Sequence, residues 1–300
     1  MQVFDLCLAW NWEYDADFVA WLESACARRG LTCLSVTPAN LESVLHDLGQ
    51  RRTAFRSFLD RASDADPAFQ PLADRARSRD VFRINPQELC RWADDKATMH
   101  LEFLNRGIHV PYTILLAPFR DAPALLGIDL TPLGGRFTIK PAHGGGGEGV
   151  IVEASTLEEV HAARQQLPHE KYLLQAHIQS CRLEGRPAWF RALYCGGAVY
   201  PCWWDTQTHV YAPVTDEQAK TFGLQPLWEI MTRIAQVCRL DLFSSEIGLT
   251  EEGLFLVADY VNNPIDLRLQ SKAADGVPDA IVASIAERLA MLVEVHGPLV

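Results

Sequence analysis

One segment of this sequence reads Phe137-Thr-Ile-Lys-Pro-Ala-His143, then Gly144-Gly-Gly-Gly-Glu-Gly149, then Val150-Ile-Val-Glu153. The glycine run contains the letters G-x-G-x-x-G, but a dinucleotide-binding fingerprint requires a helix to begin inside the motif, and a strand pattern follows here. The G-K-[ST] ending of a P-loop is missing as well. We therefore expect two antiparallel strands joined by a glycine-rich flap.

The composition of the flap suits phosphate binding. Glycine has no Cβ, so its backbone can approach a ligand closely and adopt positive φ, which lets bare N–H groups fold over phosphates. This interpretation assigns nucleotide contacts to Gly144, Gly145, Gly146, Gly147 and Gly149. The alternative is a hairpin loop without a ligand, although so many glycines in one turn lose much conformational freedom on folding.

Two lysines are candidates for the same phosphates. Lys140 ends the strand that enters the flap, where its ammonium can reach the α- and β-phosphates. Lys96 follows Asp94-Asp95, with Asp94 as the expected N-cap of a helix through Leu104, and both its charge and the free helix N–H groups favour an anion. A lysine at such a position is also typical of a solvated surface.

Two acidic side chains fall on a predicted hairpin near the end of the chain. The turn at 250–253 joins two apolar segments, and Glu246 and Asp259 lie at comparable distances from it, so their carboxylates can face one another across adjacent strands. Like charges so placed are destabilising unless a cation bridges them, and Mg²⁺ or Mn²⁺ prefers carboxylate and amide oxygens. Asn262 or Asn263 offers the amide. A surface hairpin with scattered acids is the alternative.

Bulk composition excludes several classes of protein. At 300 residues the chain exceeds the roughly 100–200 residues of one domain, so two or three modules sharing a cleft are expected. A net charge of −11 disfavours nucleic acid as a partner. No segment approaches the roughly 20 apolar residues of a membrane span, and the N-terminus has no basic n-region. Eight cysteines without C-x-x-C suggest neither a disulfide framework nor a zinc site. We expect a soluble cytoplasmic protein without a membrane partner.

The remaining pattern indicates an α/β protein in which a parallel layer comes first. Strands are predicted at 2–9, 31–37 and 53–59, with helices at 18–26 and 41–48 between them. The polar loop at 60–64 then follows a strand's carboxyl end, where open α/β sheets bind ligands, although a solvated turn is equally typical. Further along, helices are predicted at 86–92, 94–104, 156–166, 216–238 and 278–296, and strands from Pro111 and at 172–175, 187–195, 198–204, 242–249 and 253–261.

Taken together, these residues resemble the ATP-grasp superfamily, which includes D-alanine ligases, glutathione synthetases and ribosomal-protein glutamate ligases. The similarity covers about residues 83–268. It rests on Asn85-Pro86 with Asp95-Lys96, on Gly107-Ile-His-Val-Pro111-Tyr-Thr113, on Thr138-Ile-Lys140-Pro with the glycine run, and on Leu173-Leu-Gln-Ala-His-Ile178 as the adenine-binding hinge strand.

The resemblance implies an ATP-grasp fold that holds Mg-ATP between two antiparallel sheets. Its expected parts are an N-terminal parallel β-α-β domain at 1–84, a central helical part at 85–133, a lid at 134–185 and a C-terminal subdomain at 186–300. It implies adenine contacts from Gln175, Ala176 and Ile178, metal ligation by Glu246, Asp259 and Asn262, and catalytic roles for Lys140, Arg191 and Arg268. Departures from the family pattern are Ala176 in place of an acid, Asn262 three residues after Asp259 instead of two, and Trp189 in place of an acid.

The activity implied is an ADP-forming carboxylate–amine ligase that works through an acylphosphate. Its partners would be small-molecule or peptide carboxylates and amines, and the sequence leaves the oligomeric state open between a monomer and a homodimer. Candidate substrate residues are Asn11, Arg61, Ser63, Trp204 and His209. The equally typical alternatives are a core or surface aromatic for Trp204 and a solvated loop for the others. A small-molecule kinase built on the same fold and a noncatalytic nucleotide-binding protein are the alternatives.

Overall fold

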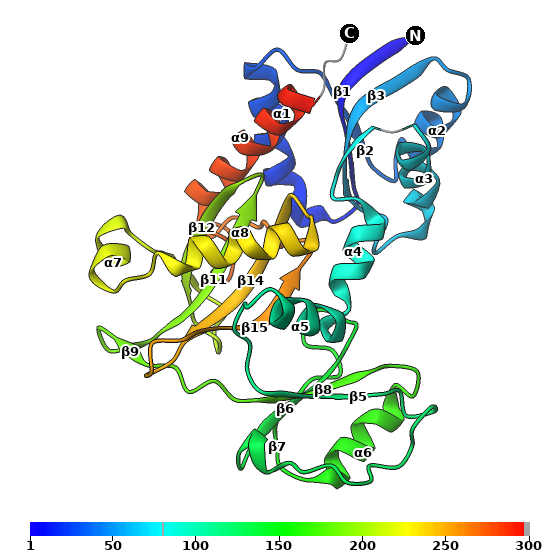
Figure 1. Ribbon diagram of the computed structural model, residues 1–300. Helices are drawn as coiled ribbons and strands as arrows, with labels where there is room; N and C mark the ends of the chain where they lie inside the picture. The colour runs from blue at the N-terminus through cyan, green and yellow to red at the C-terminus, as the bar shows by residue number, and fades with distance from the viewer. Residues whose placement is uncertain (80, 297–300) are drawn as a thin grey trace.

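The first 84 residues build a parallel sheet in the order β2-β1-β3-β4 (Figure 1). The computed structural model describes residues 1–79 and 81–296, so Asp80 and the last four residues of the expected C-terminal subdomain lie outside the described residues. The strands are β1 (Gln2–Trp10), β2 (Cys33–Val36), β3 (Thr53–Arg61) and β4 (Phe82–Ile84), and their helices are α1 (Ala16–Arg28), α2 (Leu41–Gly49) and α3 (Gln70–Ser78). The predicted parallel layer is confirmed, with β4 as an additional strand.

Side chains that alternate between the two faces of β1 show how helices cover both faces of this sheet. Leu6 and Leu8 pack with α1 and with the C-terminal helix α9 (Asp279–His296), whereas Cys7 and Ala9 pack with α2 and α3. Successive strand residues point to opposite faces, so a continuous apolar run is what a sheet buried on both sides requires. Helix α9 thereby ties the end of the described chain to its beginning.

A second sheet, which is antiparallel, carries the glycine flap. Its order is β5-β8-β6-β7, with β5 (Thr113–Leu116), β6 (Phe137–Pro141), β7 (Ile151–Ala154) and β8 (Tyr172–Ala176). Helix α6 (Leu157–Gln166) covers one face and begins with a capping box between Thr156 and Glu159. The flap at 144–149 joins β6 to β7, as the sequence predicts.

The third sheet is also antiparallel, in the order β13-β12-β11-β14-β15. The strands are β11 (Trp189–Cys195), β12 (Ala198–Trp204), β13 (Tyr211–Pro213), β14 (Leu242–Leu249) and β15 (Phe255–Asn262), with a separate small hairpin of β9 (Arg182–Leu183) and β10 (Arg186–Pro187). One face packs on α4 (Gln87–Asp94), α5 (Lys96–Asn105) and α8 (Pro226–Cys238), and part of the other face packs on α9. Short 3-10 turns lie at Glu13–Asp15, Pro67–Phe69 and Thr131–Leu133.

Two predicted helix boundaries are wrong. The helix expected over 216–238 is divided into α7 (Asp216–Thr221) and α8, because Gly223 adopts φ 63° and Pro226 cannot continue a helix. Asp94 does not cap α5 but ends α4, and Asp95 accepts the capping bonds from the backbone N–H groups of Ala97 and Thr98. Within the described residues, no helix has the length and apolar character needed to cross a membrane.

Candidate active site

A cleft of about 760 Å³ lies between the flap and the polar end of the third sheet. The sheet face that packs on α9 through Leu193 and Cys195 continues as the cleft wall at Arg191, because residues two apart on a strand share a face. The predicted site residues that line the cleft are Lys96, Lys140, Gly144, Gly145, Gly146, Gly147, Arg191, Trp204, His209, Glu246, Asp259 and Asn262. Residues more than 160 positions apart in the sequence thus meet in one cavity.

Glu246 and Asp259 face one another across the ladder of β14 and β15. Burial raises the pKa of Glu246 to about 7, the Asp259 charge adds to this effect, and the charges of Arg191 and Lys140 oppose it. Arg191 Nη1 lies 3.1 Å from Glu246 Oε1. Two half-buried carboxylates side by side destabilise each other, so this position favours a bound cation.

A β-bulge brings Asn262 to the carboxylate pair. The register pairs Glu246 with Asp259 but Ser244 with Asn262, so β15 has one residue more than β14 between these pairs. Asn262 Nδ2 donates to the Ser244 carbonyl at 3.5 Å. Asn263 Oδ1 instead accepts from Asn85 Nδ2 at 2.7 Å, which commits that oxygen to the fold. The geometry therefore favours Asn262 over Asn263 as a third oxygen donor.

Both candidate lysines reach the cleft from the second sheet and its neighbour α5. Lys140 on β6 crosses to the third sheet, where its Nζ donates to the Ala258 carbonyl at 3.1 Å. Burial lowers the pKa of Lys140, whereas the charges of Asp259 and Glu246 raise it. Lys96 Nζ donates to the Gly144 carbonyl at 2.5 Å, so the first helical residue of α5 contacts the flap. This arrangement places two ammonium groups between the flap and the carboxylate pair.

The flap itself is exposed and rich in left-handed backbone. Gly144, Gly146, Gly147 and Gly149 have φ values of 116°, 61°, 80° and 69°. These are conformations that only glycine adopts at low cost, which accounts for the composition of the run. A Cβ at Gly146 or Gly147 would meet no atom within 4 Å, so the space beside the flap is open.

An aromatic stack holds Arg191 at one end of the cleft. The Arg191 guanidinium lies 4.9 Å from the centre of the Trp204 ring. The His209 ring stacks on the same tryptophan, with centroids 5.3 Å apart and planes 4° from parallel. His209 adopts φ 58° in a turn whose backbone N–H groups bond to the Asp205 carboxylate. The stack fixes the planar cation where it faces the carboxylate pair.

The adenine residues implied by the family resemblance do not line this cleft. Gln175 is buried, and its Nε2 donates to the Tyr260 hydroxyl at 3.0 Å. The same hydroxyl lies 2.8 Å from His100 Nδ1, so Gln175 belongs to a buried network between the sheets. The backbone N–H of Ala176 donates to the Tyr112 carbonyl at 2.9 Å. Side-chain recognition of adenine by Gln175 therefore does not fit this geometry, and the main chain near Ile178 stays a prediction.

Several candidate substrate residues have structural partners instead. Arg61 is buried, and its guanidinium bonds to Asp15 at 2.6 and 2.8 Å and to the Ile265 carbonyl at 2.9 Å, which commits these donors to the fold instead of a substrate. Arg268 is held by Asp266 and Asp275, so its expected catalytic role would compete with two acids for the guanidinium. Neither Arg268 nor Asn11 lines the cleft, and Ser63 lines a smaller pocket beside it.

The sequence reasoning missed Asp94 and Asp266 as cleft residues and gave Asp64 only as part of a polar loop. Two neighbouring acids precede helix α5, and the sequence does not show whether Asp94 or Asp95 is its N-cap. Helical spacing offers a signal for Asp94, since it follows the polar residues Gln87 and Arg91 on one stripe of α4.

Comparison with known proteins gives a fold likeness and no sequence family. No protein-family model matches the chain, and no curated protein is detectably similar in sequence. Among solved structures, the D-cycloserine synthetase DcsG is 18% identical with a TM-score of 0.61, over 97% of this chain and 99% of that one. A RimK-domain ATP-grasp protein from Sphaerobacter thermophilus is 19% identical with a TM-score of 0.63, over 96% and 99%.

The D-alanine–D-alanine ligase from Bacillus anthracis, complexed with ATP, is 10% identical with a TM-score of 0.65, over 99% of this chain and 97% of that chain. These likenesses span almost the whole of each chain and include the parallel sheet as well as both antiparallel sheets. The chain has the ATP-grasp fold.

Proposed function

We propose that this protein is an ATP-dependent ligase that joins a carboxylate to an amine through an acylphosphate and releases ADP and phosphate. The observation that supports it most is the convergence in one cleft of Lys96, Lys140, Arg191, Glu246 and Asp259. A Mg-nucleotide complex carries negative phosphates and a metal cation. The phosphates complement the lysines and the arginine, and the metal complements the carboxylate pair. The similar structures include an ATP-bound ligase and an ATP-grasp ligase complexed with a precursor peptide and AMPPNP.

The residues divide into a nucleotide side and a metal side. Lys96, Lys140 and the flap N–H groups bind phosphate oxygens, because together they supply positive charge and backbone donors on one wall. Glu246, Asp259 and Asn262 fit Mg²⁺ or Mn²⁺ through hard oxygen donors, and such an ion would offset both the burial and the Asp259 charge that raise the pKa of Glu246. The bound ion would neutralise charge on the phosphates during transfer.

Arg191 serves the transferred group. A substrate carboxylate oxygen attacks the γ-phosphorus, the bond from that phosphorus to ADP breaks, and an acylphosphate forms. An amine then attacks the acyl carbon, the bond to phosphate oxygen breaks, and a proton leaves the nitrogen. The planar Arg191 guanidinium suits a carboxylate or acylphosphate better than a hydroxyl, and its place on Trp204 keeps it oriented through both steps.

Hydroxylamine trapping tests this function. The protein is incubated with Mg-ATP, hydroxylamine and a panel of carboxylates: the proteinogenic amino acids in both enantiomers, their N-acetyl derivatives, dicarboxylates and short peptides. A ligase should release ADP and form a hydroxamate with at least one of them, because hydroxylamine intercepts acylphosphates. Lys140→Met should abolish the signal, and Lys220→Met on the exposed helix α7 should retain it.

Other products would assign the protein differently. If ATP labelled in its γ-phosphate leaves the label on the product as a stable phosphate monoester, the protein is a kinase. Release of AMP and pyrophosphate would reject both activities. No stimulated turnover with any member of the panel, in a protein that still binds Mg-ATP, would favour a noncatalytic nucleotide-binding protein.

A further inference from the structure

A pocket of about 250 Å³ opens beside the cleft, at the carboxyl ends of β3 and β4. It shares Asp64, Asp94, Asn263 and Pro264 with the cleft, so the two spaces are continuous. The carboxyl edge of a parallel sheet is where loops and helix termini leave room for a ligand. The chemistry of the polar groups in this pocket then indicates what it can hold.

Helix α4 presents a polar stripe to this pocket. Gln87, Cys90, Arg91 and Asp94 all line it, and their spacing of three, four and seven residues places them on one face of the helix. A helix that lies between two layers normally turns an apolar stripe toward its neighbour. A polar stripe over an open space is stabilised by water or by a polar ligand.

Most of the polar groups here are already satisfied by the fold. Asp60 accepts from the backbone N–H groups of Ala62 and Ser63 and from the Ser63 hydroxyl, and Gln87 bonds to Gln70. Asn85 bonds to the main chain at 241–242 and to Asn263. By contrast, no hydrogen bond or ion pair with another described residue engages the side chains of Asp64, Arg91 or Asp94.

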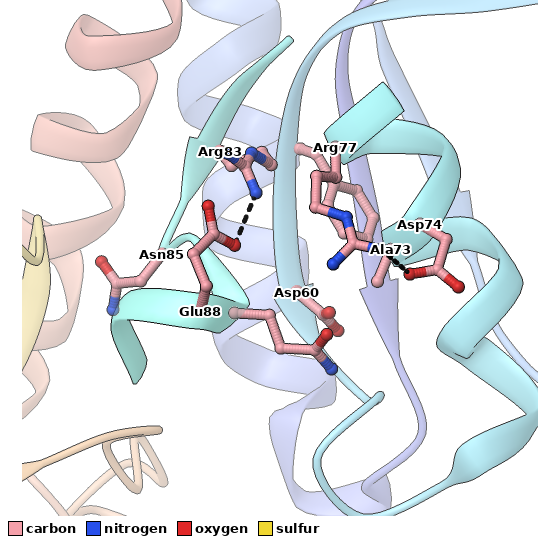
Figure 2. A pocket seen from close by; sticks show the side chains of 9 residues that line it. Asp60, Ala73, Asp74, Arg77, Arg83, Asn85 and Glu88 are labelled. Carbon is pink, nitrogen blue, oxygen red and sulfur yellow. Dashed lines mark hydrogen bonds and ion pairs between the residues drawn. The ribbon is translucent and has the colours of Figure 1, made fainter. Parts of the chain in front are cut away.

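The neighbouring crevice shows what a structural set of charges looks like in this part of the molecule. Figure 2 shows Arg83 against Glu88 and Arg77 against Asp74, at 2.8 and 3.0 Å, around a crevice of only about 10 Å³. Its arginines pair with its acids and almost no space remains. The larger pocket has space, two carboxylates and one guanidinium without such partners, so its charges are free to complement a ligand.

The positions of these charges give the ligand an orientation. Asp64 and Asp94 line both the pocket and the cleft, whereas Arg91 lines the pocket alone. A positive group therefore fits at the junction with the cleft, and a negative group fits farther from the phosphates. Burial raises the pKa of Asp94, the charges of Lys96 and His143 oppose this effect, and the Asp64 charge adds to it, so the position still favours a further positive group. Two carboxylates also suit a metal ion, as proposed for Glu246 and Asp259, but the Arg91 guanidinium that lines the same pocket complements a negative group, so a ligand that carries both charges fits.

We propose that this pocket binds a small zwitterion of the α-amino acid class, with its ammonium at Asp64 and Asp94 and its carboxylate at Arg91. Its amino group then faces the cleft and is the nucleophile of the ligation, and its own carboxylate is held away from the γ-phosphate. The nucleophile role rests on the proposed ligase function, whereas the binding does not.

Thermal unfolding with saturating Mg-AMPPNP tests the binding. The proteinogenic amino acids are added singly, in both enantiomers, and at least one should raise the melting temperature beyond the nucleotide's own shift. Its N-acetyl derivative, which lacks the ammonium, and its amide, which lacks the carboxylate, should bind about tenfold more weakly or worse, since each loses a charged hydrogen bond. A panel in which no amino acid adds a shift would overturn the proposal while leaving the nucleotide shift, and with it the proposed function, intact.

Two variants assign the two ends of the ligand. Arg91→Gln should bind the amino acid and its amide equally well, and Asp94→Asn should lose the preference for the free amine over the N-acetyl form. Arg77→Gln is the matched control, because that exposed arginine lines only the crevice of Figure 2. If Arg91→Gln still binds the amino acid more tightly than its amide, by the same factor as wild type, the contact between Arg91 and the ligand carboxylate is refuted. A hydroxamate formed from the bound amino acid alone would show that its carboxylate is activated, which would overturn the orientation.

Discussion

The polar end of the third sheet and the glycine flap face one another across the same cleft but are built in opposite ways. Arg191, Glu246 and Asp259 lie on neighbouring strands held by ladder bonds. The flap at 144–149 is exposed and has no apolar side chain to pack. Charges that must be placed accurately belong on rigid elements, whereas a cover that must admit and release a ligand belongs on a weakly packed one.

The largest effect is expected at the carboxylate pair. Asp259→Asn should reduce turnover by about 100-fold or more, because metal binding contributes several kcal/mol to phosphoryl transfer. The fold should persist, since the change removes a repulsion. Steady-state ADP release and circular dichroism measure the two effects. Glu251→Gln, in the exposed turn of the same hairpin, should retain normal turnover, and an Asp259→Asn protein as active as wild type would show that the rigid end is not the metal site.

The pH dependence of stability should report the same pair. Burial and the Asp259 charge raise the pKa of Glu246 to about 7, so the folded state holds this proton more tightly than the unfolded state. That contribution favours folding at low pH and is lost as pH rises through about 7. In Glu246→Gln the side chain is neutral at every pH, so this loss of stability does not occur.

The measurement is the melting temperature of Glu246→Gln relative to wild type without metal or nucleotide. The difference should grow in favour of the variant between about pH 5 and about pH 8. A difference that stays constant across this range would mean that neither burial nor the Asp259 charge raises the pKa of Glu246 in the free protein.

Hydrogen exchange should separate the two regions directly. Amides of residues 143–149 should exchange rapidly without nucleotide, and those of β14 should exchange slowly, because only the strand amides are held in a buried ladder. Mg-AMPPNP should slow exchange in the flap and change β14 little. A flap already protected in the free protein would contradict its assignment as a mobile cover.

The smallest effect is expected within the flap. Gly146→Ala adds a methyl group that meets no atom within 4 Å, so its cost is the left-handed backbone at φ 61°. That strain, roughly 1 kcal/mol, should raise the KM for ATP by about fivefold and leave the melting temperature unchanged. Gly135→Ala, just before β6, with a φ outside the left-handed region and equally open space, should change neither value. A fall in melting temperature would show that the flap is packed.

Local patterns allowed much of this structure to be predicted. The pairing of Glu246 with Asp259 follows from equal spacing about a turn, and the strand–flap–strand order follows from glycine content between apolar segments. Contacts between distant segments could not be predicted in this way. Arg61 is buried because Asp15, which lies 46 residues away, neutralises it, and Gln175 is turned inward by Tyr260, 85 residues on. The pocket beside α4 depends on where β3 and β4 end relative to that helix, which no single segment specifies.

The most direct test is the thermal shift produced by Mg-AMPPNP in wild type and in Lys140→Met. Lys140 crosses from the flap sheet to the third sheet at Ala258, so it belongs to both halves of the proposed nucleotide site. The nucleotide should raise the melting temperature of wild type in a magnesium-dependent manner, and Lys140→Met should lose most of that shift while Lys220→Met keeps it. Equal shifts in wild type and Lys140→Met would contradict the placement of Mg-ATP between the two antiparallel sheets.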